Sequence, residues 1–166
     1  MIIECIMEPS SLFALLAFVA ACFLAAIPGA VFRPGRWYER LVKPRWRPPN
    51  WLFAPIWTVL YLTIAVSGWL VWGEAGIAGA ALPLAIFALQ LVLNAAWMPL
   101  FFGLHRPDLA FLEIMVLWLS ILATIALFYP IHSGAALLLV PYLAWVSFAA
   151  ALNFAVWRLN PSARAL

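Results

Sequence analysis

Five long apolar segments, joined by short polar stretches, make up most of this 166-residue chain. They cover about 11–32, 51–73, 79–102, 107–129 and 134–157. The first, of roughly 22 residues rising ~1.5 Å each, reaches about 33 Å, enough to cross the hydrocarbon core of a bilayer. Lipid offers the backbone no hydrogen bonds, and the segments are continuously apolar rather than alternating, so they must be helices. The sequence therefore predicts an all-α integral membrane protein, one domain over 1–166 built as a five-transmembrane-helix bundle.

The composition excludes several other classes of protein. With 68% hydrophobic and 9% charged residues, the chain does not resemble a soluble globule. Its net charge of +3 comes from basic residues beside apolar spans, which is typical of membrane topology rather than of nucleic-acid binding. Cys5 precedes the first span and Cys22 lies within it, so we expect neither a disulfide nor a metal site. The expected environment is the lipid bilayer, with no nucleic-acid partner.

The charges support five spans and give an orientation. In this arrangement all nine basic residues fall on one side of the membrane: Arg33, Arg36, Arg40, Lys43, Arg45, Arg47, Arg106, Arg158 and Arg164. Glu4, Glu8 and Glu74 fall on the other side. By the positive-inside rule, the sequence predicts that the N-terminus lies outside and the C-terminus inside.

The first loop, residues 33–50 between the first two spans, is basic and rich in proline and aromatic residues. Lys43-Pro44 and the pair Pro48-Pro49 prevent helix formation and hold the chain in a stiff, extended path. A stiff aromatic loop at the membrane surface is typical of a lid. We therefore expect this loop to close a ligand cavity.

Tryptophans point to where that cavity lies. Trp57, Trp97 and Trp145 each fall in the inner half of a different span, whereas Trp51, Trp69, Trp72 and Trp157 lie near span ends, where tryptophan forms interfacial belts. Flat aromatic walls beneath a basic lid suit a large, flat, mostly apolar ligand with acidic groups. Tetrapyrroles fit this description, and sterols fit it without the acids. An aromatic-rich core without any ligand is the alternative.

Other patterns leave alternatives open. Gln90, Asn94 and Trp97 share a helix face and form either an interhelical clamp or a pocket wall. Glu113 could snorkel, pair with Arg106 or relay protons. Two stripes of small residues could pack inside the bundle or form a dimer interface: Ala17, Ala21, Ala25 and Gly29 in the first span, and Ala81, Ala85 and Ala88 in the third. The chain has no triad, phosphate loop or paired carboxylates, so ordinary catalysis is not expected.

Several motifs together resemble the translocator protein family, also called tryptophan-rich sensory protein or peripheral benzodiazepine receptor. They are Trp37-Tyr38, Lys43-Pro44-x-Trp46-x-Pro48-Pro49-x-Trp51, Trp57 with Leu60-Tyr61, Gln90-Leu91-x-x-Asn94-x-x-Trp97-x-Pro99-x-Phe101-Phe102-Gly103, Pro141-Tyr142-Leu143-Ala144-Trp145, and Leu152-Asn153. The resemblance covers nearly the whole chain.

The resemblance implies a dimeric five-helix bundle whose cavity binds porphyrins, haem, sterols and benzodiazepine-type drugs. It implies a membrane receptor, sensor or transporter linked to tetrapyrrole homeostasis and stress, without an obligatory cofactor, in a bacterial cell envelope. Pattern and resemblance together give the expected ligand-binding residues: Trp37, Tyr38, Pro48, Trp57, Tyr61, Gln90, Asn94, Trp97, Tyr142, Trp145 and Ala149.

The resemblance also raises a second function and one departure. In some family members, tryptophans equivalent to Trp57 and Trp145 are implicated in light-dependent porphyrin breakdown, so an oxidoreductase is the alternative. The family's sterol-recognition motif requires tyrosine where this chain has Phe154, before Arg158. That motif is weak even when complete. The departure disfavours sterol at this motif and favours a tetrapyrrole ligand.

Overall fold

The computed structural model describes residues 9–161, and within that range it contains helices and no strands. Glu4, Cys5, Glu8 and Arg164 lie outside the described residues. The helices are α2 (Pro9–Val31), α3 (Arg36–Arg40), η1 (Asn50–Leu52), α4 (Phe53–Gly79), α5 (Ala81–Met98), η2 (Pro99–Gly103), α6 (Pro107–Phe128), α7 (Ser133–Leu138) and α8 (Val140–Leu159). Within 9–161, five helical segments are long and apolar enough to cross a membrane, which confirms the predicted all-α bundle.

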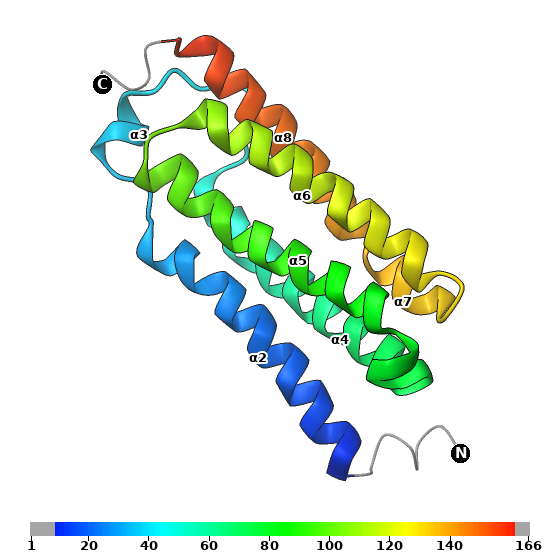
Figure 1. Ribbon diagram of the computed structural model, residues 1–166. Coiled ribbons are helices and arrows are strands. Elements are labelled where there is room, and N and C mark those ends of the chain that lie inside the picture. The colour runs from blue at the N-terminus through cyan, green and yellow to red at the C-terminus, as the bar shows by residue number, and fades with distance from the viewer. Residues whose placement is uncertain (1–8, 162–166) are drawn as a thin grey trace.

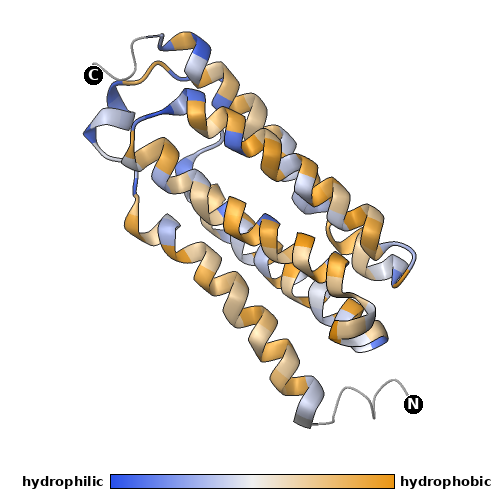
Figure 2. Ribbon diagram, viewed as in Figure 1, coloured by the Kyte–Doolittle hydropathy of each residue, from blue (hydrophilic) through white to orange (hydrophobic). Residues whose placement is uncertain are grey.

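The long helices lie side by side as one elongated bundle (Figure 1). The main packing contacts join α5 to α6, α6 to α8, and α2 to α4 and α5. Both α3 and the end of α8 lie at one end of the bundle, and α7 with the end of α4 lies at the other. Coloured by hydropathy, the helices are mostly orange, and blue concentrates at the end that carries the first loop (Figure 2). The apolar surface thus faces lipid as well as the core, as expected for a membrane bundle.

Two helix boundaries differ from the prediction. The connection expected at 74–78 is largely helical, because α4 continues to Gly79 and is interrupted only at Gly76, whose φ of 65° is readily adopted by glycine alone. The fifth span is divided into α7 and α8 at Leu139. Pro141 has no N–H to donate to the carbonyl of Leu137, so a regular helix cannot run through this point.

The charge pattern can be tested by thiol labelling. The first loop lies at the opposite end of the bundle from Glu74, near the end of α4 (Figure 1). After Cys5 and Cys22 are replaced, we expect Arg45→Cys and Glu74→Cys, both at exposed positions, to react with an impermeant thiol reagent from opposite sides of sealed vesicles. Labelling of both from one side would contradict five spans, and Glu74→Cys reacting from the inside would reverse the orientation.

Candidate functional site

A cavity of about 400 Å³ lies within the bundle beneath the first loop. Its walls come from α2, α4, α5, η2, α6 and α8, and Pro34, Tyr38 and Asn50 of the first loop also line it. The volume is in the range of sites that hold small organic ligands. The cavity therefore occupies the region that the tryptophan positions indicated.

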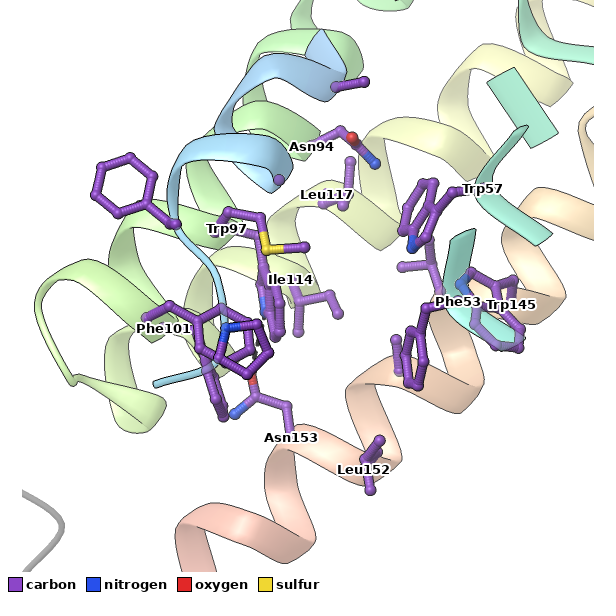
Figure 3. Close-up of a pocket in the computed structure, with 18 of the residues that line it drawn as sticks. Phe53, Trp57, Asn94, Trp97, Phe101, Ile114, Leu117, Trp145, Leu152 and Asn153 are labelled. Atoms are coloured by element: carbon purple, nitrogen blue, oxygen red, sulfur yellow. Dashed lines mark hydrogen bonds between the residues drawn. The ribbon is translucent and has the colours of Figure 1, made fainter. Parts of the chain in front are cut away.

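Aromatic side chains form two sides of the cavity. Figure 3 shows Trp57, Phe53 and Trp145 on one side, and Trp97 with Phe101 on the other. The rings of Phe53 and Trp145 are 5.6 Å apart between centroids, and Trp97 stacks on Phe101 at 4.9 Å. These contacts hold the rings in place and leave apolar surface facing the cavity.

Helical spacing explains why these residues face one another. Trp57 and Tyr61 are four residues apart in α4, and Trp145 and Ala149 are four apart in α8, so each pair shares a helix face. In α5, Asn94 and Trp97 are three residues apart and line the same wall. The antiparallel helices bring these faces together below the first loop.

A hydrogen-bonded chain runs from the cavity into the core. Tyr61 Oη donates to Asn94 Oδ1 at 2.6 Å, and Asn94 Nδ2 donates to Tyr142 Oη at 3.0 Å. Tyr142 Oη donates in turn to Gln90 Oε1 at 3.0 Å. Asn94 thus links helices and lines the cavity, whereas Gln90 only links helices, and its Nε2 is buried with no hydrogen-bond partner among residues 9–161.

A second polar link fixes Trp97. Its Nε1 donates to Asn153 Oδ1 at 3.0 Å, and Asn153 Nδ2 donates to the Pro107 carbonyl at 2.8 Å. This link joins α5, α6 and α8 at the loop end of the bundle. Because these polar groups are hydrogen-bonded to one another, they stabilise the cavity wall and are not available to bond a ligand.

The indole N–H of Trp145 has no such partner. Its Nε1 is buried and forms no hydrogen bond with any described residue. Figure 3 shows the nitrogen-bearing edges of Trp57 and Trp145 turned toward each other. A buried unpaired donor is costly, but this nitrogen is covered even from the cavity, so a ligand acceptor would reach it only if a neighbouring side chain moved.

Two basic side chains lie at the loop side of the cavity. Arg47 Nη1 donates to Tyr38 Oη and to Asn50 Oδ1, each at 3.2 Å, and Lys43 Nζ lies 4.7 Å from the centre of the Tyr38 ring. Partial burial lowers the pKa of Lys43, and the charge of Arg47 lowers it further. A negatively charged ligand group placed here would offset the repulsion between the Lys43 and Arg47 charges.

The structure separates the expected site residues into two groups. Seven line the cavity: Tyr38, Trp57, Tyr61, Asn94, Trp97, Trp145 and Ala149. Four do not: Trp37, Pro48, Gln90 and Tyr142. Trp37, in α3 of the first loop, is buried and stacks on His105 at 4.4 Å, and Tyr142 is fully buried behind the cavity wall.

Some lining residues were not anticipated. Ile114 and Leu117 of α6, Met98 of α5 and Phe101 of η2 all face the cavity. In α6 the buried Ser120 and Thr124 lie on the same helix face as Leu117, a polar signal for the inward side that was not used. Asn153 was quoted only as part of a family motif, although an amide at membrane depth is itself such a signal.

The contacts test one other hypothesis, the pairing of Glu113 with Arg106. Pairing of Glu113 with Arg106 is wrong, because Arg106 forms a two-point salt bridge with Asp108 at 2.8 Å. Both Glu113 carboxylate oxygens are buried without a hydrogen-bond partner in the described part of the chain. Across residues 9–161, no group of three His, Cys, Asp or Glu side chains could hold a metal ion.

Comparison with known proteins gives the family. Residues 15–158 match the TspO/MBR family. The chain is 47% identical over 145 residues to Protein CrtK of Rhodobacter capsulatus, covering 87% of this chain and 91% of that protein. It is 42% identical to the tryptophan-rich sensory protein of Cereibacter sphaeroides, over 90% and 95% of the two chains, and 39% identical to human translocator protein, over 87% and 89%. Matched in sequence along nearly its whole length, this five-span chain belongs to the TspO/MBR family.

Proposed function

We propose that this membrane protein is a receptor, sensor or transporter that binds tetrapyrroles such as protoporphyrin IX or haem in the cavity beneath the first loop. The observation that carries the proposal is the cavity itself, about 400 Å³, with indole rings from three helices in its walls. A flat conjugated ring can contact such walls over both faces. The names of the relatives, tryptophan-rich sensory protein and translocator protein, support sensing or translocation as the role.

The charged groups favour a ligand with acids. Lys43 and Arg47 supply positive charge at the loop side of the cavity. A tetrapyrrole could place its apolar ring against the tryptophans and its carboxylates beside these cations. Benzodiazepine-type drugs would use the same walls without the charges.

Sterol recognition through the motif in α8 receives less support. Phe154 stands in the tyrosine position, and its side chain is 44% exposed on the bundle surface, where it packs against Phe111 and Trp157. It does not line the cavity. A sterol bound at this motif would therefore occupy a different site from the proposed tetrapyrrole.

The alternative function is light-dependent breakdown of the bound porphyrin. It is favoured by one observation, that Trp57 and Trp145 lie together on one side of the cavity with their nitrogen-bearing edges facing (Figure 3). Both indoles could then contact one part of the same ligand. In this alternative function, the cavity would be a reaction site as well as a binding site.

One experiment tests both functions. Purified protein is titrated with protoporphyrin IX in the dark, and quenching of indole fluorescence reports binding. The complex is then illuminated, and the extracted pigment is analysed by absorption and mass. Recovery of unchanged porphyrin supports binding alone, whereas a bilin-like product that requires Trp57 and Trp145 supports the alternative. Absence of any quenching at micromolar ligand would contradict both.

We also propose that the protein forms a homodimer through α5. The part of the α2 stripe nearer the first loop is internal, since Ala25 is buried and lines the cavity, and a methyl group added at Gly29 would contact Met98 at 3.6 Å. By contrast, Ala81, Ala85 and Ala88 are all exposed. Small exposed residues allow a second helix to approach closely.

Substitution on α5 should therefore change the oligomeric state. We expect Ala85→Leu combined with Ala88→Leu to shift detergent-solubilised protein toward monomer, because larger side chains keep two helices apart. Light scattering coupled to gel filtration measures the mass. Ala17→Leu, at an exposed position of α2, is the matched control and should leave the dimer intact. The reverse pattern would place the interface on α2.

A further inference from the structure

Asn160, the residue directly after α8, is hydrogen-bonded to the first loop. Its Oδ1 accepts from the Val42 N–H at 2.9 Å, and its Nδ2 donates to the Val42 carbonyl at 2.9 Å. Val42 and Asn160 are 118 residues apart in the chain. One side chain thus forms both bonds that a neighbouring strand would offer this residue.

The Asn160 side of this contact is buried, and the two bonds to Val42 are partly buried. Asn160 is only 7% exposed, and its Nδ2 also donates to the Val156 carbonyl at 2.7 Å, which holds the amide in one orientation. Hydrogen bonds protected from water resist exchange with solvent better than exposed ones. The amide is therefore a rigid anchor at the end of α8.

Val42 is well placed to control the loop. It follows Leu41, which is 4% exposed and packs in a small cluster with Trp37, Phe101 and Val156. Tyr38, in the helix that ends one residue before Leu41, lines the cavity. Holding Val42 against α8 therefore holds α3 above the cavity.

Beyond Val42 the loop has other contacts. Trp46 is 51% exposed and packs edge to face on Phe148 of α8, with ring centroids 5.6 Å apart. The two Arg47 hydrogen bonds, each 3.2 Å long, join residues of the loop to one another rather than to the bundle. The Asn160 contact is thus a strong polar tie between the loop and the bundle.

We propose that Asn160 is a latch that keeps the first loop closed over the cavity and so sets how fast a ligand leaves. Asn160 does not line the cavity, so it acts as a positioning residue through Val42. The part of this inference that concerns release rests on the proposed tetrapyrrole function. The part that concerns the loop does not.

The loop part is tested without ligand by amide hydrogen exchange. In the unmodified protein, the Val42 amide should exchange slowly, although its partner is a side chain. In Asn160→Ala, the amides of Val42 and of residues 36–41 should exchange roughly tenfold faster, because the loop loses both of its hydrogen bonds to the Asn160 side chain. Amides of α8 before Val156 should be unchanged. Arg158→Ala, an exposed position in the same helical turn, is the matched control and should not affect the loop.

The release part is tested with protoporphyrin IX. An excess of a second, porphyrin-binding apoprotein is added to take up porphyrin as it dissociates. Release should be about tenfold faster from Asn160→Ala than from the unmodified protein or Arg158→Ala. The comparison requires that the three proteins have similar melting temperatures. If the unmodified protein does not bind porphyrin, the proposed function fails, and hydrogen exchange still decides the loop part.

Three outcomes would overturn the latch. The first is that the Val42 amide of the unmodified protein exchanges as fast as an amide in an unstructured peptide. This measurement needs no variant, so it is decisive even if Asn160→Ala does not fold. The second is a folded Asn160→Ala in which only the end of α8 exchanges faster, which would make Asn160 a helix cap alone. The third is a loop that opens faster while porphyrin release is unchanged.

Discussion

Replacing Trp145 with alanine should weaken protoporphyrin IX binding about 5- to 150-fold, which corresponds to a loss of roughly 1 to 3 kcal/mol. The substitution removes a large aromatic ring that lines the cavity. Trp57→Ala, on the same side of the cavity, should have an effect of similar size. Quenching of the remaining indole fluorescence measures the affinity.

Two further variants separate the causes. Trp145→Phe keeps an aromatic ring in the wall but removes the larger indole and its N–H, so it should lose less affinity than Trp145→Ala, about tenfold or less. Trp97→Ala should weaken binding too, but it also breaks the bond to Asn153, so its melting temperature must be measured alongside.

The matched control is Trp72→Ala, near the far end of α4 and outside the cavity lining. Trp69 is a poorer control, because its Nε1 donates to the Ser11 carbonyl at 3.1 Å and joins α4 to α2. If Trp72→Ala weakens binding as much as Trp145→Ala, the porphyrin lies elsewhere and the cavity tryptophans serve packing alone.

Gly68→Ala should destabilise the bundle by about 1 to 3 kcal/mol, the usual cost of overfilling a packed core. A methyl group at Gly68 in α4 would lie 2.7 Å from Phe18 Cε1 and 2.8 Å from Phe87 Cζ. Those two rings already pack edge to face, with centroids 5.8 Å apart, so neither can withdraw freely. Thermal unfolding in detergent should show a lower melting temperature.

Gly73→Ala is the control on the same helix. A methyl group there would meet nothing within 4 Å, and alanine favours a helix over glycine by up to ~1 kcal/mol. This variant should therefore be neutral or slightly more stable. Equal melting temperatures for Gly68→Ala and Gly73→Ala would mean that α2, α4 and α5 do not meet as closely as described.

The number and type of spans could be predicted from the sequence because lipid enforces them. A chain segment in hydrocarbon must satisfy its own backbone hydrogen bonds, so a long apolar run has only one accessible structure. Boundaries were less predictable where glycine and proline act: Gly76 interrupts α4 late, and Pro141 divides the fifth span. These local effects depend on how each end packs.

The membership of the cavity was predictable only in part. Trp57, Trp97 and Trp145 were identified by depth and by the family motifs, and all three line it. Gln90 and Asn94 share a face by spacing, yet only Asn94 reaches the cavity, while Gln90 bonds Tyr142 behind it. The two positions are one helical turn apart on the same face. Spacing cannot tell which turn lies beside the cavity and which is covered by a neighbouring helix.

Thus the sequence alone determined five spans, the clustering of basic residues at one end and the family, since these depend on the composition and order of segments. The tertiary structure alone decided which side chains meet: Ile114 and Ala25 facing the cavity, Asn153 holding Trp97, and Asn160 holding Val42 across 118 residues. The reason is physical. In helices that are apolar at most positions, hydrophobicity has too weak a period to mark the whole inward face, so packing against neighbouring helices selects it.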